Sequence, residues 1–138
     1  MSFLYLLDTN VASEATRPSP RERVVQRINR YEGQIAIASI VWHELQYGLE
    51  FLPRSHRRDR LEKYLNDDVW AKMSILDYDA AAAEWHARER VRLTARGQTP
   101  KFVDGQIAAI AAVHDLTLVT FNVRDFNDFE GLRVESWW

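Results

Sequence analysis

The stretch FLYLLDTN, Phe3–Asn10, contains the pattern that decides the fold of this 138-residue chain. Its five consecutive apolar residues are typical of a strand that is buried on both faces, as strands of parallel sheets are. An aspartate, Asp8, follows directly, and in open parallel sheets ligands bind outside the carboxyl ends of the strands. Asp8 is therefore either a ligand-binding group or a helix N-cap, because Asp, Thr and Asn all cap helices well.

The composition is that of one globular domain spanning residues 1–138. Apolar residues make up 46% of the chain and aromatic residues 12%, which excludes a disordered protein. Cysteine is absent, and this excludes disulfides, thiolate metal sites and a cysteine nucleophile. No apolar run is long enough to span a bilayer, so we expect a cytoplasmic protein without membrane association. The net charge of −2 does not by itself indicate a nucleic-acid partner.

Strand patterns alternate with longer helical patterns along the rest of the chain, which predicts an α/β fold. We expect a mostly parallel central sheet of four or five strands flanked by helices. Strands are expected at residues 3–7, 34–38, 116–120 and 132–136, and residues 72–76 form either a strand or an extended connector. Helices are expected at residues 21–31, 40–51 with Ser39 as their cap, 55–65, 78–96 with Gly97 as the stop, and 101–114.

Further polar residues stand at strand ends or in apolar helical stripes. Glu44 has apolar and small helical neighbours, so we expect it to face the core side of its helix, where an arginine or another partner must offset its charge. Asp104 heads a second inward stripe, although the helix macrodipole alone also favours an acid in a first turn. Asn122 and Asp125 follow a later strand and share the sheet edge of Asp8 if the strands are parallel.

Acids gathered in one pocket repel one another and raise each other's pKa unless a cation offsets their charge. Hard divalent ions such as Mg²⁺ and Mn²⁺ prefer carboxylate and water ligands. Zinc is disfavoured, because cysteine is absent and the four histidines show no HExxH-like spacing. We therefore expect a Mg²⁺ or Mn²⁺ site, of the kind that activates water and binds a phosphate during in-line displacement.

Four segments together resemble the PIN-domain ribonucleases, most closely the VapC and FitB type of toxin–antitoxin proteins. They are LLDTN at Leu6–Asn10, HELQYG at His43–Gly48, DGQIAA at Asp104–Ala109 and LVTFNVRDF at Leu118–Phe126. The resemblance covers essentially the whole chain and implies a three-layer PIN-like α/β fold. It also implies a metal-dependent endoribonuclease toxin that inhibits translation and growth, forms a homodimer and is silenced by a VapB-like antitoxin.

The same resemblance implies roles for individual residues. Asp8, Glu44 and Asp104 match catalytic acids that hold one or two Mg²⁺ or Mn²⁺ ions in the family. Thr9 and Asn10 match polar residues that line the same pocket.

Asn122 departs from the family pattern, because several relatives have an aspartate at its position. The nearest downstream carboxylate is Asp125, which is either an outer member of the metal site or a surface turn residue, and Asn122 is expected to line the pocket. An amide brings no charge, so one or two bound ions both stay open. The alternative function is a non-catalytic PIN-like module that binds nucleic acid or a partner protein. A metal-dependent phosphatase or DNA nuclease would use similar acids.

Basic residues should flank a pocket of acids that has to admit RNA. The segment PRSHRRDR at residues 53–60 supplies Arg54, Arg57, Arg58 and Arg60. These side chains bind RNA phosphates, contact the antitoxin, or form a solvated helix face. His43 precedes Glu44 but points to another face of the helix, so we interpret it as structural.

Overall fold

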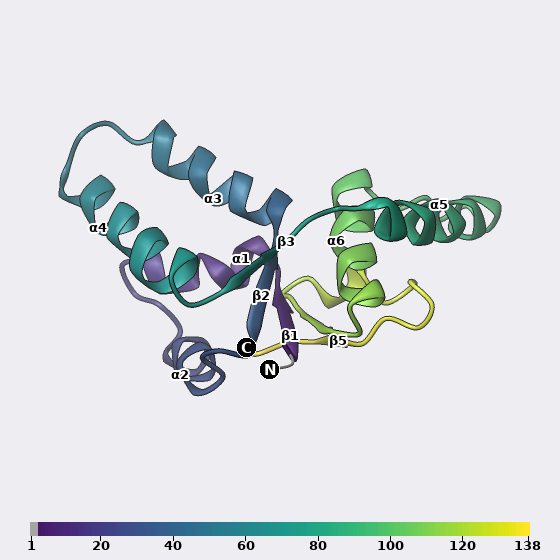
Figure 1. Ribbon diagram of the computed structural model, residues 1–138, viewed down its shortest axis with the longest axis horizontal. Helices are drawn as coiled ribbons and strands as arrows, with labels where there is room; N and C mark the ends of the chain where they lie inside the picture. The colour runs from purple at the N-terminus through teal and green to yellow at the C-terminus, as the bar shows by residue number, and fades with distance from the viewer. Residues whose placement is uncertain (1–2) are drawn as a thin grey trace.

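The computed structural model describes residues 3–138 and has a five-stranded sheet at its centre (Figure 1). The strands are β1 (Tyr5–Leu7), β2 (Ile35–Ala38), β3 (Ser74–Leu76), β4 (Thr117–Val119) and β5 (Val134–Glu135). Their order in the sheet is β3-β2-β1-β4-β5, and every neighbouring pair is parallel. The predicted α/β fold with a mostly parallel sheet is thereby confirmed, and all carboxyl ends of the strands lie at one edge.

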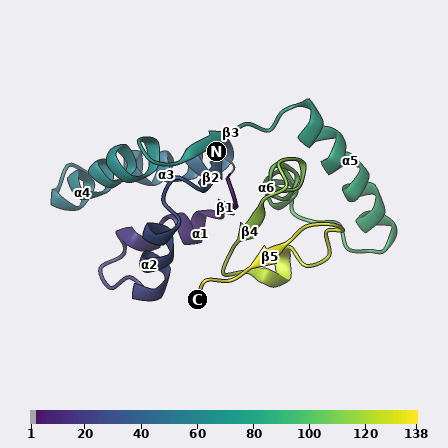
Figure 2. The ribbon, with the colours of Figure 1, turned by 60° about the horizontal axis from the view of Figure 1, so that its bottom comes forward.

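Helices cover both faces of the sheet, which gives the three layers expected of a PIN-like fold. On one side lie α1 (Thr9–Ala12), α2 (Glu22–Arg30), α3 (Ser39–Phe51) and α4 (His56–Tyr64), and on the other α5 (Ala80–Ala95) and α6 (Phe102–Val113) (Figures 1 and 2). Short helical turns complete the chain: η1 (Glu14–Thr16), the π-helical η2 (Leu65–Trp70) and η3 (Val123–Asp125). None of the helices within residues 3–138 combines the length and the apolar character that crossing a membrane requires.

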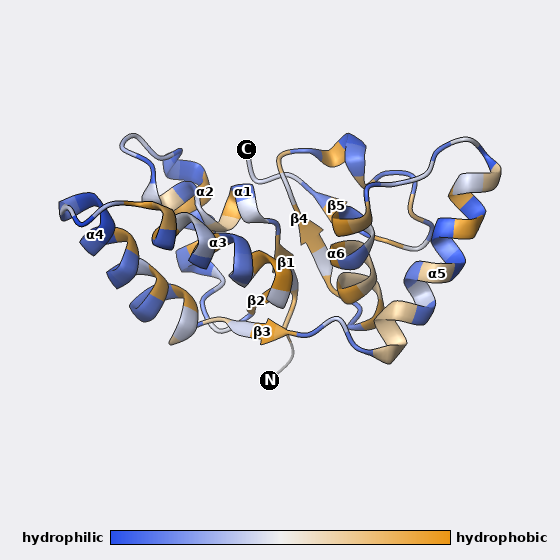
Figure 3. Cartoon of the chain, turned by 90° about the horizontal axis from the view of Figure 1, so that it is seen from above, coloured by the Kyte–Doolittle hydropathy of each residue, from blue (hydrophilic) through white to orange (hydrophobic). Residues whose placement is uncertain are grey.

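The core lies between the sheet and its two helical layers. All four residues of β2 are buried, as are Leu6 and Leu7 of β1. Helix α6 contributes the unbroken buried run 107–111. Strands β1, β2 and β4 are among the most apolar segments in Figure 3. Burial on both faces explains why the first strand reads as a continuous apolar run and not as an alternating one.

Most elements lie within a few residues of their predicted bounds, but the caps differ. Ser39 was expected to cap a helix and is instead the first residue of α3, with Ala38 in the cap position. That prediction was wrong, because β2 runs into α3 without an intervening residue. Ser55 and Asp79 cap α4 and α5 with their side chains. Residues 74–76 form a strand, which rules out the alternative of an extended connector.

Helices α3 and α4 run antiparallel and project together from the sheet (Figure 1). Arg58 of α4 forms hydrogen bonds to the end of α3 and to the residue that follows it. Its Nη1 donates hydrogen bonds to the carbonyl oxygens of Leu49 at 2.9 Å and Leu52 at 2.8 Å. Its Nη2 donates to the Glu50 carboxylate at 3.3 Å. The Leu49 carbonyl also accepts the N–H of Leu52, at 3.1 Å, and Leu52 itself is the C-cap of α3. Arg58 therefore adds to the cap of α3 from the next helix.

Candidate active site

Asp8 is held rigidly at the centre of the carboxyl edge of the sheet. Its N–H donates to the carbonyl of Val119 at 2.9 Å, which joins β1 and β4 one residue beyond the strands. One carboxylate oxygen accepts the Thr9 N–H and the other accepts the Thr120 hydroxyl, both at 2.8 Å. Asp8 is thus the N-cap of α1, as one interpretation of the sequence held, and at the same time it lines a pocket.

The pocket at this edge, here called the carboxylate pocket, has a volume of about 680 Å³ and is open to solvent. It brings together six of the predicted site residues: Asp8, Thr9, Asn10, Glu44, Asp104 and Asn122. Its remaining walls are Ile40 and His43 from α3 and Val103 and Ile107 from α6. Figure 3 shows how α3 and α6 stand on either side of the ends of β1 and β4.

Glu44 reaches this pocket from a position that the sequence did not predict. The buried residues of α3 are Val41, Leu45 and Leu49, and Glu44 itself is exposed. The expectation that Glu44 faces the core side was therefore wrong. The inward stripe of α3 lies one residue further along than expected, which leaves Glu44 at its border with free access to solvent and to the pocket.

The carboxylates of the pocket share an electrostatic environment that disfavours their negative charge. Burial raises the pKa of Asp104 to about 6, and the charges of Asp8, Asp125 and Glu44 add to the rise. Burial likewise raises the pKa of Asp8, although the hydrogen bonds from Thr120 and Thr9 oppose it. The pKa of Glu44 is raised by burial and by the charge of Asp8. A cation in the pocket would relieve this repulsion.

The donor set fits a hard divalent ion. Carboxylate, amide and hydroxyl oxygens face the pocket, and the buried hydroxyl of Thr9 has no hydrogen-bond partner among residues 3–138 although it lies near Glu44. Within the same residues no three Asp, Glu or His side chains are arranged to hold an ion together. Mg²⁺ keeps several waters and takes only one or two protein carboxylates, so Asp8 and Asp104 with water fit its needs.

Asp125 and the arginines lie outside the lining of the pocket. Asp125 is exposed in η3 and influences the pocket through its charge, as the raised pKa values of Asp8 and Asp104 show. Arg54 and Arg58 line a different hollow, beside α4. Arg57 and Arg60 line another hollow, on the side of α4 that faces η1.

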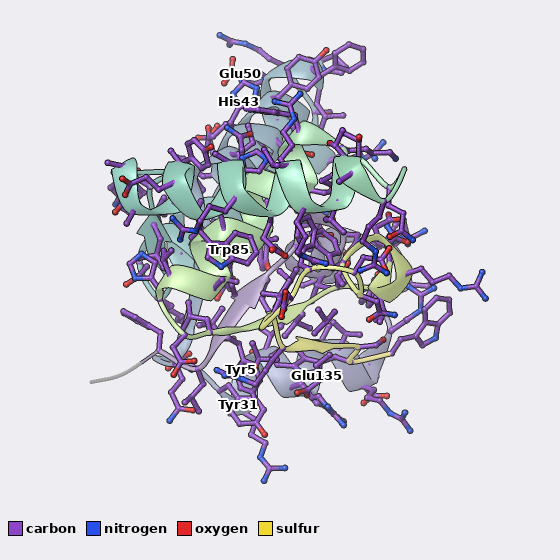
Figure 4. The ribbon with its side chains drawn as sticks, turned by 90° about the vertical axis from the view of Figure 1, so that its right-hand side faces the viewer. Tyr5, Tyr31, His43, Glu50, Trp85 and Glu135 are labelled. Atoms are coloured by element: carbon purple, nitrogen blue, oxygen red, sulfur yellow. The ribbon has the colours of Figure 1, made fainter. Side chains whose placement is uncertain are left out.

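Two residues of the pocket region were missed by the sequence interpretation. Thr120 is fully buried and bonds both the Asp8 carboxylate and the N–H of Asn122, the latter at 3.0 Å. Thr120, like Asp8, is a polar residue at the end of an apolar run, so the sequence could have identified it as a residue of the pocket region. His43 was interpreted as structural, yet it is exposed and lines the pocket. Figure 4 shows it at the opposite end of the molecule from Tyr5.

Asp8 after β1, Glu44 on α3 and Asp104 on α6 line one pocket at the carboxyl edge of a parallel sheet, which is the arrangement that the resemblance to PIN domains implies. The PIN domain family matches residues 5–132, and the chain belongs to this family. The chain is 34% identical over 133 residues to the tRNA(fMet)-specific endonuclease VapC of Shigella flexneri, an alignment that covers 96% of the chain and 97% of that protein. It is 32% identical over 126 residues to toxin FitB of Neisseria gonorrhoeae, covering 89% of the chain and 91% of FitB.

Solved structures agree with these sequence relatives. FitAcB from Neisseria gonorrhoeae superimposes with a TM-score of 0.89 at 30% identity, over 98% of the chain and 99% of the FitAcB chain. DNA-bound VapBC from Salmonella typhimurium superimposes with a TM-score of 0.83 at 30% identity, over 99% of both chains. The predicted resemblance to VapC and FitB proteins is thereby confirmed.

Proposed function

We propose that this protein is a metal-dependent endoribonuclease that hydrolyses RNA phosphodiester bonds and acts as the toxin of a toxin–antitoxin pair. The observation that carries the proposal is the convergence of Asp8, Glu44 and Asp104 from three separate elements on one open pocket. Relatives that match over nearly the whole chain are named ribonucleases or endonucleases, which supports the same reaction class.

In this proposal Asp8 and Asp104 hold the metal ion, either Mg²⁺ or Mn²⁺. When bound, the ion offsets charge in the transition state and lowers the pKa of the attacking water. Two hydrogen bonds fix the Asp8 carboxylate in advance, so little reorganisation is needed on binding. Glu44, with its raised pKa and its access to solvent, orients the attacking water and accepts its proton on a carboxylate oxygen.

The expected partners follow from the relatives. The solved neighbours include toxin–antitoxin complexes, and we propose that a VapB-like antitoxin binds this chain and silences it. We also propose that the chain forms a homodimer and acts in the cytoplasm, where cleavage of RNA inhibits translation and growth. Because one relative is named for initiator tRNA, a substrate panel should contain that tRNA beside other tRNAs, rRNA fragments and an unstructured RNA.

The test is cleavage of this panel by the purified chain in Mg²⁺, in Mn²⁺ and in EDTA, with Asp8→Asn as the matched variant. Asparagine also caps helices, so Asp8→Asn keeps α1 while it removes one charge from the pocket. We expect cleavage in both metals and a loss of at least about a hundredfold in EDTA and in the variant. Undiminished cleavage in EDTA or in Asp8→Asn would contradict the metal mechanism.

The second candidate function is a non-catalytic module that binds RNA or a protein. The observation that favours it is Asn122, which lines the pocket without contributing charge. RNA binding without cleavage in either metal would support this candidate. If cleavage then appears in Asn122→Asp, the missing fourth carboxylate accounts for its absence in the parent chain.

A further inference from the structure

The carboxylate pocket repels the substrate that we propose for it. Asp8, Glu44 and Asp104 present negative charge where an RNA phosphate must lie, and Asp125 adds to the same field. The net charge of the chain is −2, so no overall positive field compensates. Phosphate contacts supply most of the affinity of proteins for nucleic acids. Attraction for RNA must therefore come from a local group of cations, and this inference rests on the proposed function.

The four arginines among residues 54–60 differ in whether their side chains are free to bind a phosphate. Arg58 is engaged with carbonyls at the end of α3 and with Glu50. Arg54 lines a hollow that also contains Asp59 and Glu62, whose charges oppose an anion. Arg57 and Arg60 are exposed and take no part in the ion pairs of the described chain.

Arg57 and Arg60 meet Arg17 around one hollow of about 440 Å³, here called the arginine pocket. The other lining residues come from η1, the turn after it, the end of α3 and α4, and they are Ala15, Thr16, Pro18, Leu52, Leu61 and Tyr64. No carboxylate belongs to this lining. Among residues 3–138 the one ion pair of Arg17 is with the Glu14 carboxylate, at 3.6 Å, and its side chain is 62% exposed. Three guanidinium groups around a hollow favour a multiply charged anion such as a phosphate chain.

A short rigid link joins the arginine pocket to the catalytic edge. Tyr64 lines the arginine pocket, and its hydroxyl donates to the carbonyl of Ala12 at 2.7 Å. Ala12 is the last residue of α1, and Asp8 caps the other end of this four-residue helix. At a rise of 1.5 Å per residue, α1 is about 6 Å long. The two pockets are therefore separated by little more than the Tyr64 side chain and α1.

We propose that the arginine pocket binds phosphates of the RNA strand whose scissile bond lies in the carboxylate pocket, through Arg17, Arg57 and Arg60. The faces of Leu52, Leu61 and Tyr64 form a floor for a ribose or a base. An acidic segment of a partner protein would satisfy the same charges, but the link to Asp8 through α1 favours the substrate strand.

The experiment measures binding of a fluorescent single-stranded RNA 20-mer between 50 and 200 mM salt, in the Asp8→Asn background so that the RNA stays intact. Arg57→Gln/Arg60→Gln is compared with Arg23→Gln/Arg30→Gln, which removes the same charge from α2. For single-stranded nucleic acid each phosphate contact contributes about −0.7 to the slope of log K against log salt. Loss of two contacts should make the slope shallower by about 1.4, so the fall in affinity over this range becomes about sevenfold smaller.

Each outcome decides between the possibilities. A slope that changes equally in both double variants, or in neither, overturns the proposal. So does a loss of binding to polyglutamate without a loss of binding to RNA, because it assigns the pocket to an acidic protein. A thermal midpoint within about 2 °C of the background shows that the variants fold, and Arg57→Lys/Arg60→Lys should keep the slope. If the wild-type chain cleaves no RNA while the slope still changes, the proposed function fails and the binding site stands.

Discussion

Replacement of Gly105 by alanine should destabilise the protein, although the same change stabilises most helices. Gly105 lies in α6 directly after Asp104, and a Cβ atom there would stand 2.2 Å from Nε2 and 2.6 Å from Cδ2 of His86. His86 is only 2% exposed, and its Nδ1 lies 2.8 Å from the Tyr78 hydroxyl. A shift of the buried ring away from the new methyl group would strain that hydrogen bond or move α6 away from α5.

The magnitude follows from three contributions to the free energy of unfolding. Overpacking of a core costs about 1–3 kcal/mol, and a clash this close belongs at the upper end. Loss of the bond between Tyr78 and His86 adds about 1 kcal/mol. The higher helix propensity of alanine increases the free energy of unfolding by about 1 kcal/mol. The net destabilisation is about 2–3 kcal/mol, which lowers the melting temperature of a chain of this size by roughly 8–10 °C.

Urea denaturation of Gly105→Ala, His86→Ala and the double variant tests this reasoning. His86→Ala opens space for the new methyl group, so the double variant should be more stable than the sum of the single changes predicts, by about 2 kcal/mol. Metal-dependent cleavage by Gly105→Ala should fall by more than the unfolded fraction explains, since the shifted turn carries Asp104. A Gly105→Ala variant as stable as the parent, or strictly additive effects, would refute the packing argument.

Three further predictions concern charge and hydrogen bonding. The pKa of Asp104 is raised to about 6, so the folded chain binds a proton at this carboxylate more tightly than the unfolded chain does. In EDTA, Asp104→Asn should therefore increase the free energy of unfolding above pH 6. Urea titrations should show that this gain disappears below about pH 4. An unchanged difference from pH 4 to 8 would contradict the shift. Arg58→Gln should cost about 1–2 kcal/mol and speed amide exchange at residues 49–55, whereas Arg54→Gln should do neither. Tyr64→Phe removes the bond to Ala12 and should cost about 1 kcal/mol in the same assay, and a neutral effect would mean that water replaces the bond.

The features that the sequence predicted depend on local pattern. Continuous apolar runs identify β1 and β2 because buried parallel strands need no alternation. The strand-end rule placed Asp8 at the pocket, since all carboxyl ends of a parallel sheet share one edge. Asp104 was placed by the apolar run 107–111, which turns one side of α6 towards the sheet.

Other features, among them the orientation of side chains on a helix, depend on contacts between distant residues. Glu44 and His43 both face the pocket because the buried stripe of α3 is set by its packing on the sheet, which neighbouring residues alone do not reveal. The role of Arg58 depends on the antiparallel course of α3 and α4, which brings its guanidinium to the carbonyl of Leu49. Arg17 and Arg57 line one pocket because α4 packs against η1.

The hydrogen bond between Asp8 and Thr120 also determines when the pocket can exist during synthesis. The two residues are 112 positions apart, and Asp104 enters the pocket from a helix that is itself made late. A nascent chain that has left the ribosome up to α5 contains Asp8 and Glu44 but lacks Asp104, Thr120 and β4. If the protein acts on RNA as proposed, the machinery that translates it meets Asp8, Glu44, Asp104 and Thr120 together only after nearly nine-tenths of the chain has been made.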